Sequence, residues 1–409
     1  MTFLLLAGCA GQPTGQVPQG QVPQGQVTAP PDDSPTASTS ASASEGVPSA
    51  APPEDIPPTA KAGTVEALLS SMTLEEKVGQ LFFVRCPASQ AAEKVSEYHL
   101  GGYILFGRDF QDDAGNWLTR EQVAQRLTSY QTAADIPLLI GVDEEGGWVV
   151  RASRNPNLFD AARQSPQEVY SRGGLDAIIE DTLFYSRGLL ELGININLAP
   201  VADVSTDPND FIYHRSFGQD GTATASYVEA VVTAANQVRY APGDGTSLAI
   251  GSVLKHFPGY GNNADTHTGV AIDQRPYGQF TAEDFLPFRS GIRAGAGGVL
   301  VSHNVVLSMD RSLPASLSPE VHRILREELG FEGVIMTDDL AMDAVVAYAA
   351  DGSVAVLAVL AGNDLIVTTD FVEQIPLVID AVRTGVISED AIDGAVRRVL
   401  GWKYDLGLL

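Results

Sequence analysis

From residue 62 onward, short runs of apolar residues alternate with longer stretches in which apolar and polar positions are mixed. The short runs are continuously apolar, which is typical of parallel strands that are buried on both faces. We predict eight such strands, and eight is the number that closes a parallel α/β barrel. They are Leu81–Val84, Gly102–Phe106, Leu138–Val142, Ile194–Leu198, Ala249–Leu254, Gly298–Ser302, Gly333–Thr337 and Asp364–Val367.

The mixed stretches carry signals of helix starts. A hydroxyl residue precedes several of them, where its side chain can accept a hydrogen bond from the first helical turn. These residues are Thr73, Thr119, Thr281 and Ser318. The alternation of strands and helices predicts an α/β fold, a (β/α)8 TIM-type barrel that forms a single domain over residues 62–409. An open α/β sheet remains the alternative, because periodicity cannot establish closure.

The preceding segment, residues 10–61, has a different composition. It is rich in proline, repeats Gly-Gln-Val-Pro-Gln, and then becomes rich in serine, alanine and threonine. No aromatic residue occurs between Phe3 and Phe82, so the segment has too little apolar surface to fold. We predict a disordered linker that tethers the barrel domain.

Residues 1–9 are mostly apolar and end in Leu6-Ala7-Gly8-Cys9. This ending resembles the lipobox of bacterial lipoproteins, in which the cysteine is lipidated. The segment is too short to span a membrane and lacks a basic region, so we expect it to be the truncated end of a signal sequence. We therefore predict that Cys9 is lipidated and anchors the protein to the extracytoplasmic side of a bacterial cell membrane. A chance match is the alternative.

The chain is strongly acidic, with 51 Asp and Glu residues against 25 Lys and Arg residues and a formal net charge of -26. Such a charge repels phosphate backbones, which argues against nucleic acid as a partner. The second cysteine is Cys86, so we expect no disulfide within the mature chain. We expect the protein to be a monomer.

Polar and charged residues gather directly after the predicted strands. In a parallel α/β barrel these positions form one rim, where active sites lie. Taken singly, some of these residues could have a purely structural role. Lys255 could form an ion pair with a carboxylate, and Asp339 could cap a helix that begins at Leu340. The clustering therefore carries the prediction of a catalytic site. The rim residues are Asp143, Glu144, Glu145, Pro200, Asp203, Lys255, His256, Asp265, His267, His303, Asn304 and Asp338.

Several of these residues belong to longer motifs. The most specific is Lys255-His256-Phe257-Pro258-Gly259-Tyr260-Gly261, followed by Asp265-Thr266-His267. Supporting segments are residues 72–80, 101–106, 143–147, 197–204, 215–218 and 337–340. Together the motifs resemble those of the glycoside hydrolase family 3 β-N-acetylhexosaminidases, over residues 70–409.

This resemblance implies a retaining, exo-acting β-N-acetylglucosaminidase. Such an enzyme would remove terminal N-acetylglucosamine from peptidoglycan fragments or chitin-type oligosaccharides. The resemblance implies that Asp338 is the nucleophile of a covalent glycosyl-Asp intermediate, that His267 is the general acid/base, and that Asp265 is its partner. The residues implied in holding the sugar are Asp143, Arg215, Lys255 and His256, with Arg151 as a further candidate.

The chemistry of these residue types agrees with the resemblance. A retaining glycosidase needs a carboxylate that traps the oxocarbenium-like state and a proton donor beside the leaving oxygen. Asp338 follows a buried strand, which fixes its position. An imidazole with a pKa of about 6.5 can donate and then accept a proton near neutral pH, and Asp265 would orient that of His267. Because this pair supplies the proton donor, we expect no second domain.

Three other functions are weaker. A zinc hydrolase is disfavoured because the sequence has no His-Glu-x-x-His motif, so we predict no metal and no cofactor. A β-glucosidase-type member of family 3 is disfavoured by the Asp265 and His267 pair. A non-catalytic cell-surface carbohydrate-binding lipoprotein would have no use for a nucleophile such as Asp338.

Trp148 occupies a position at which relatives often have a basic residue. Its side chain either packs against the protein or stacks on a sugar.

Overall fold

The computed structural model describes residues 58–243, 245–263, 271–346, 348 and 353–409. Eight parallel strands form one sheet in the order β11-β9-β7-β4-β3-β2-β1-β12. A parallel bridge from Met336 of β11 to Leu365, directly before β12, closes the sheet. The predicted (β/α)8 barrel is confirmed. The strands are β1 Phe82–Arg85, β2 Gly102–Leu105, β3 Leu139–Val142, β4 Ile196–Asn197, β7 Gly251–Phe257, β9 Gly298–Val301, β11 Val334–Thr337 and β12 Ile366–Thr368.

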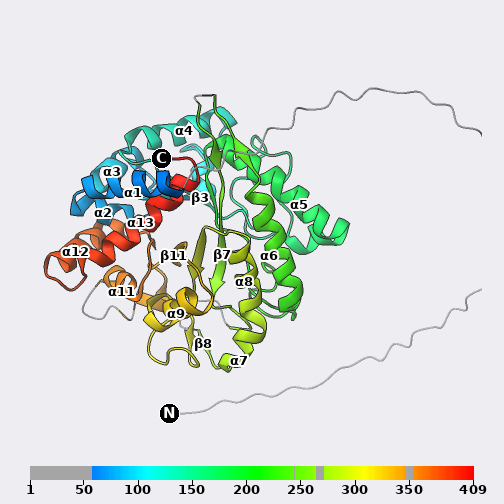
Figure 1. Cartoon of the computed structure of the whole chain (residues 1–409). Coiled ribbons are helices and arrows are strands. Elements are labelled where there is room, and N and C mark those ends of the chain that lie inside the picture. Colours follow the sequence, from blue (N-terminus) through cyan, green and yellow to red (C-terminus); the bar gives the residue numbers. More distant parts are fainter. Residues whose placement is uncertain (1–57, 244, 264–270, 347, 349–352) are drawn as a thin grey trace, which may run out of the picture. The chain divides into compact units, whose positions relative to one another are not determined.

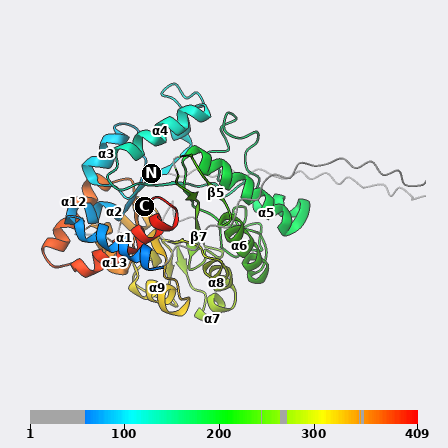
Figure 2. The ribbon, with the colours of Figure 1, turned by 45° about the horizontal axis from the view of Figure 1, so that its top comes forward.

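Helices surround the strands, as Figures 1 and 2 show from two directions. None of the helices in the described ranges is long and apolar enough to cross a membrane. The first helix begins at Pro58, before the predicted domain start at residue 62, and Cys9 and linker residues 10–57 lie outside the described residues. The main helices are α1 Pro58–Ser71, α2 Leu74–Gln80, α3 Ala91–Tyr98, α4 Arg120–Ala133, α5 Pro166–Leu192, α6 Gly221–Ala235, α8 Phe285–Arg293, α9 Pro319–Arg323, α11 Val354–Ala361, α12 Phe371–Arg383 and α13 Glu389–Asp405.

Shorter elements decorate the loops between these strands and helices. β5 pairs with β6 in an antiparallel manner, and β8 pairs with β10 in a parallel manner. The short strands are β5 Arg239–Tyr240, β6 Leu248–Ala249, β8 Ile272–Asp273 and β10 Val305–Val306. The short helical segments are η1 Gly107–Phe110, α7 Tyr277–Gln279, η3 Phe280–Asp284, η4 Ala315–Leu317, η5 Ile324–Glu328 and α10 Asp343–Val346.

Three of the predicted helix caps are confirmed, at Thr73, Thr119 and Ser318. At the start of α2, the N–H of Glu76 donates to the hydroxyl of Thr73, and the N–H of Thr73 donates to the carboxylate of Glu76. Thr119 forms the same reciprocal pair at the start of α4. These bonds satisfy N–H groups that the first turn leaves without intrahelical partners, and a cap of this kind stabilises a protein by about 0.5–2 kcal/mol.

The prediction that Thr281 caps a helix is wrong, because that helix begins earlier. α7 starts at Tyr277, directly after Pro276, and the chain continues through η3 into α8. Thr281 lies within η3, where its hydroxyl donates to the carbonyl of Gly278 at 3.0 Å. The fixed φ of proline suits the approach to a helix. The helix therefore starts at Tyr277, with Pro276 at the N-cap position and no side-chain cap.

The indole of Trp402, on α13, closes the end of the barrel at which the strands begin. It packs with apolar side chains of the strands in the barrel interior. A Cβ atom at Gly297 would lie 2.1 Å from the indole Nε1, and one at Gly251, the first residue of β7, would lie 2.6 Å from the ring. These glycines let the indole approach the backbone closely. The barrel interior is thus a packed core, and the rim at the carboxyl ends carries the loops.

Candidate active site

A cavity of about 300 Å³ lies at the carboxyl ends of the strands. Charged side chains from β1, from β7 and from the loops after β3, β4 and β11 face it, over a floor of apolar residues that come mostly from the strands. Six predicted site residues, Asp143, Arg151, Arg215, Lys255, His256 and Asp338, line this cavity. Asp265 and His267 lie outside the described residues. The other lining residues are Arg85, Ile104, Phe106, Glu145, Val149, Leu198, Leu300, Asp339, Met342 and Val367.

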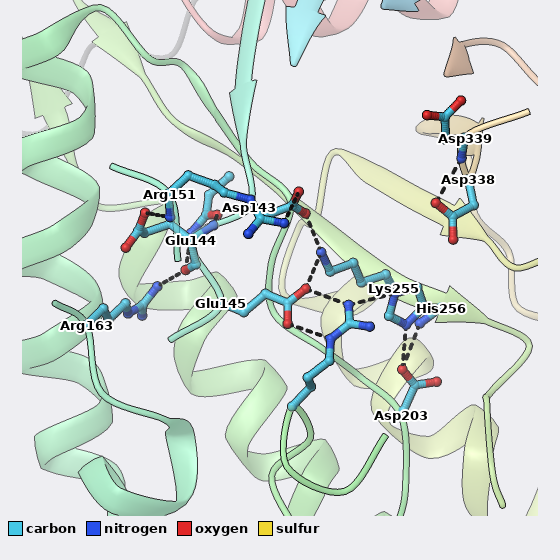
Figure 3. Close-up of polar contacts among 12 residues, drawn as sticks. Asp143, Glu144, Glu145, Arg151, Arg163, Asp203, Lys255, His256, Asp338 and Asp339 are labelled. Atoms are coloured by element: carbon cyan, nitrogen blue, oxygen red, sulfur yellow. Dashed lines mark hydrogen bonds and ion pairs between the residues drawn. The ribbon is translucent and has the colours of Figure 1, made fainter. Parts of the chain in front are cut away.

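Lys255 forms the centre of a buried ionic network. Its Nζ lies 2.7 Å from Oδ1 of Asp143 and 2.6 Å from Oε1 of Glu145, and the side chain is 3% exposed. Arg215 donates to both oxygens of Glu145, from Nε at 3.0 Å and from Nη2 at 2.8 Å. Figure 3 shows Lys255 reaching toward Asp143 and Glu145. The structural reading of Lys255 as an ion-pair partner is therefore confirmed, and the pair lies inside the cavity.

This network keeps its members charged. Burial by itself would raise the pKa of Glu145, but Arg215 and Lys255 hold that pKa well below its usual range. Burial would likewise lower the pKa of Lys255, but Asp143 and Glu145 outweigh it and raise that pKa. A buried charge without a partner would be strongly destabilising. The cavity therefore offers a ligand fixed charges of both signs near neutral pH.

The ring of His256 is fixed between an acidic and a basic partner. Its Nδ1 lies 2.7 Å from Oδ2 of Asp203, and its Nε2 lies 3.2 Å from Nη2 of Arg215. A guanidinium only donates, so we assign the proton of the neutral ring to Nδ1, from which it is donated to Asp203. Asp203 is itself held by the backbone N–H of Tyr260 at 2.7 Å.

An irregularity in β7 brings two consecutive side chains into the same cavity. Neighbours along a regular strand point to opposite faces. The pairing of β7 with β9 shifts register between Leu254 and Phe257, and both Lys255 and His256 line the cavity. The sequence motif that starts at Lys255 thus coincides with a local departure from regular strand geometry.

Two arginines approach the same aromatic ring at the cavity wall. The guanidinium carbon of Arg85 is 4.3 Å from the ring centroid of Phe106, and that of Arg151 is 5.5 Å from it. Arg151 also approaches Asp143, with Nη2 3.9 Å from Oδ2. Within the part of the chain that the structure describes, the buried Nε atoms of both arginines have no hydrogen-bond partner. Both arginines line the cavity and add positive charge to its wall.

Asp338 directly follows β11 and faces the cavity. Its backbone N–H donates to the carbonyl of Val301 at 3.1 Å, and its Oδ1 accepts from the N–H of Asp339 at 2.8 Å. In Figure 3 its carboxylate points toward the side of Lys255 and His256. A carboxylate held at the end of a buried strand has a defined position, which suits a nucleophile.

Asp339 does not cap a helix at Leu340, so that structural reading is wrong. Its Oδ1 accepts from the N–H of Ala341 at 3.0 Å within a turn, and the next helix, α10, begins at Asp343. Burial raises the pKa of Asp339, and the neighbouring carboxylate of Asp338 raises it further. The turn places Asp339 beside Asp338 at the wall of the cavity.

Comparison with known proteins shows the family of this chain. Residues 73–401 match the N terminal domain of glycosyl hydrolase family 3. The chain belongs to this family. The beta-hexosaminidase LpqI of Mycobacterium tuberculosis is 32% identical over 382 residues, which cover 90% of this chain and 91% of that protein.

Solved structures of this family resemble the barrel domain. A family 3 beta-N-acetylglucosaminidase from Paenibacillus sp. is 30% identical with a TM-score of 0.72, and the match covers 83% of this chain and 63% of that one. A beta-N-acetylhexosaminidase from Beutenbergia cavernae is 28% identical with a TM-score of 0.69, and the match covers 81% of this chain and 98% of that one.

The three consecutive carboxylates of this family 3 hydrolase have different roles. Glu144 points away from the cavity and accepts hydrogen bonds from the N–H groups of Arg151 and Ala152, at 3.0 and 2.9 Å. Burial raises the pKa of Glu144, and its bonds to Ser153 and to these N–H groups oppose that rise. Glu144 therefore fixes the loop that carries Arg151.

The sequence placed Glu145 and Asp203 at the rim but gave them no role, and it missed Arg85. Alternation of side chains in extended backbone was a usable signal for Glu145, because residues 143 and 145 share a face. Arg85 is the last residue of β1, and in a parallel α/β barrel residues at the carboxyl ends of strands lie at the rim that carries the active site. This position was the signal for Arg85. Asp203 contacts His256 in β7 and Tyr260 directly after it. The sequence does not reveal that the chain brings these residues together.

Proposed function

We propose that this family 3 hydrolase is a retaining, exo-acting β-N-acetylglucosaminidase. It removes terminal N-acetylglucosamine from peptidoglycan fragments or chitin-type oligosaccharides. The observation that carries the proposal is the position of Asp338, which faces a preformed cluster of charged groups across a cavity of about 300 Å³. The relatives named for β-N-acetylglucosaminidase and β-hexosaminidase activity support the choice of sugar.

The cluster of Asp143, Arg215, Lys255 and His256 binds the terminal sugar. Asp143 accepts hydrogen bonds from hydroxyl groups, while Lys255 and Arg215 donate to them. The cationic groups are held by Glu145, so they need no reorganisation when the sugar enters. The cavity volume is at the lower end of the range for small-molecule sites, which favours one sugar ring and hence exo action.

Asp338 then acts as the nucleophile. A bond forms between its carboxylate oxygen and the anomeric carbon while the bond from that carbon to the leaving oxygen breaks. The leaving oxygen takes a proton from His267, which Asp265 orients. In the second step His267 removes a proton from water, the water oxygen attacks the anomeric carbon, and the carboxylate of Asp338 is released.

The anchoring of the protein is a separate part of the proposal. Cys9 carries the lipid, and the linker holds the barrel outside the cytoplasmic membrane of a bacterium. The support is the lipobox-like ending Leu6-Ala7-Gly8-Cys9 and the composition of residues 10–61. Mass spectrometry of the native protein should find acyl chains on Cys9 in the membrane fraction. An unmodified cysteine in the cytosolic fraction would refute it.

The test of the activity is hydrolysis of two nitrophenyl glycosides by the purified chain. We expect cleavage of the N-acetyl-β-glucosaminide and much slower cleavage of the β-glucoside. Asp338→Asn is the control, because it keeps the shape of the side chain and removes the nucleophile. Preference for the glucoside would indicate a β-glucosidase. If the wild-type protein hydrolyses neither glycoside, the result would indicate a carbohydrate-binding protein.

A further inference from the structure

Two aromatic rings form an exposed stack on the rim of the barrel. The ring centroids of Trp148 and His214 are 4.4 Å apart, and the planes are inclined by 25°. Tyr213 meets His214 edge-on, with centroids 5.4 Å apart. Trp148 is 62% exposed, which is more than any other large hydrophobic side chain in the described part of the chain. We call Trp148 and His214 the aromatic platform.

The platform residues adjoin cavity residues along the chain. Trp148 directly precedes Val149, which lines the cavity, and His214 directly precedes Arg215, whose guanidinium binds Glu145 inside it. The two loops that carry the rings, after β3 and after β4, thus each supply an inner cavity residue and an outer aromatic ring. A substrate that leaves the cavity over these two loops would come to the platform.

The backbone holds Trp148 at the tip of a tight hairpin. Gly146 pairs with Val149, and the N–H of Gly147 donates to the carbonyl of Arg163 at 2.9 Å. Gly146 has a φ of 100°, and a Cβ there would lie 2.2 Å from the carbonyl oxygen of Gln164. The side chain of Arg154 also donates to the carbonyl of Trp148 at 3.1 Å. A rigid loop loses little conformational freedom when a ligand binds.

Packing does not explain this arrangement, since more than half of the Trp148 side chain faces solvent. Exposed aromatic surface at the edge of a cavity is typical of a binding site. A sugar ring in its chair form presents C–H groups on its faces, and these pack against an aromatic ring whose face is electron-rich. His214 stacks on the indole, and the 62% exposure of Trp148 leaves indole surface for such a contact.

We propose that the aromatic platform binds the second sugar of the substrate, the residue on the far side of the bond that is cleaved. This inference rests on the proposed function, and it assigns Trp148 a role in choosing substrates with a sugar at that position. The indole stacks on the face of this second ring, while the cavity holds the terminal sugar.

The kinetic test compares chitobiose with methyl N-acetyl-β-glucosaminide, which has no second sugar. Trp148→Ala should lower the ratio of kcat/KM for chitobiose to that for the methyl glycoside about tenfold, which corresponds to about 1.4 kcal/mol of binding. Trp148→Phe should restore the ratio to within about threefold, because it keeps a flat ring. Phe184→Ala is the matched control, since Phe184 is an aromatic residue on α5 with 58% exposure that does not line the cavity. An unchanged ratio in Trp148→Ala overturns the inference.

A binding test keeps this inference separate from the proposed function. The tryptophan emission of the full-length Asp338→Asn variant should shift to shorter wavelength with chitobiose but not with N-acetylglucosamine, and the shift should vanish in a double variant with Trp148→Phe. Absence of the shift, or an equal shift with the monosaccharide, overturns the platform. If the wild type hydrolyses neither glycoside, the proposed function fails, and this titration still decides whether the platform binds sugar.

Discussion

Two lysines lie almost completely buried at opposite ends of the barrel, in very different surroundings. Lys255 is at the carboxyl end, between the carboxylates of Asp143 and Glu145. Lys403 is on α13 at the other end, where its Nζ donates to Oε1 of Gln80 at 2.6 Å. Burial lowers the pKa of Lys403 to about 7, whereas at Lys255 the two carboxylates outweigh burial and raise the pKa.

The difference shows that burial alone does not decide the charge of a side chain. At the rim, opposite charges keep Lys255 ionised, and an ionised group can hold the hydroxyl groups of a sugar. At the closed end, Lys403 fills space beside Trp402 and loses part of its charge near pH 7. The site end therefore depends on electrostatic balance, and the other end depends on packing.

Among the changes that test this comparison, Lys255→Met should have the largest effect on activity. The change leaves Asp143 without its lysine partner and Glu145 with Arg215 alone, and loss of one partner from a buried pair costs about 3–5 kcal/mol of stability. We expect kcat/KM for the nitrophenyl N-acetyl-β-glucosaminide to fall at least about a thousandfold, because a donor to the sugar is lost as well. Lys403→Met is the matched control and should leave kcat/KM unchanged. Similar losses of activity in both variants would contradict the comparison.

A smaller effect should follow from Asp203→Asn. The amide is neutral, so it holds the Nδ1–H of His256 less strongly than the carboxylate does. We expect kcat/KM to fall about 10- to 100-fold, the equivalent of about 1.5–3 kcal/mol for a hydrogen bond to a charged group. Because we propose that His256 binds the terminal sugar, we expect most of the change to appear in KM. If Asp203→Asn lowers the melting temperature and leaves KM unchanged, Asp203 stabilises the fold and does not position substrate through His256.

The smallest effect on activity should come from Lys403→Met, whose effect is on stability. The folded pKa of Lys403, about 7, is below its ordinary value of 10.5, so between these pH values the unfolded chain binds more protons. Stability from this group therefore rises with pH in that window and falls as pH drops toward 7. The free energy of unfolding of the wild type should rise by up to about 1.4 kcal/mol per pH unit relative to Lys403→Met. Denaturant melts of both proteins at several pH values would measure this, and parallel pH profiles would show that Lys403 stays charged.

The sequence predicts the barrel because the information is local. Most of the eight strands coincide with short runs that are mainly apolar, and polar residues that follow these runs line the cavity, as at Asp143, Lys255 and Asp338. The helix cap at Thr119 is local in the same sense. Thr281 misled the prediction because Pro276, a few residues earlier, had already started the helix.

Other features depend on distant contacts and could not be predicted. Nothing in the sequence pattern distinguishes Lys403 from the other polar residues of its helix. Its burial follows from the packing of α13 against α2 and the end of the barrel. His256 pairs with Asp203 at the point where β7 shifts its register with β9, and no residue pattern signals this shift. The stack of Trp148 on His214 joins two loops that are far apart in the sequence.

The central claim, that Asp338 forms a covalent glycosyl-enzyme, is most directly tested by trapping the intermediate. A fluorosugar analogue of N-acetylglucosamine that forms the intermediate quickly and releases it slowly is incubated with the full-length protein, which is then digested and analysed by mass spectrometry. We expect a single sugar label on the peptide that contains Asp338, and no label in Asp338→Asn. A label on another carboxylate, or rapid hydrolysis of chitobiose with no covalent label at all, would contradict the account.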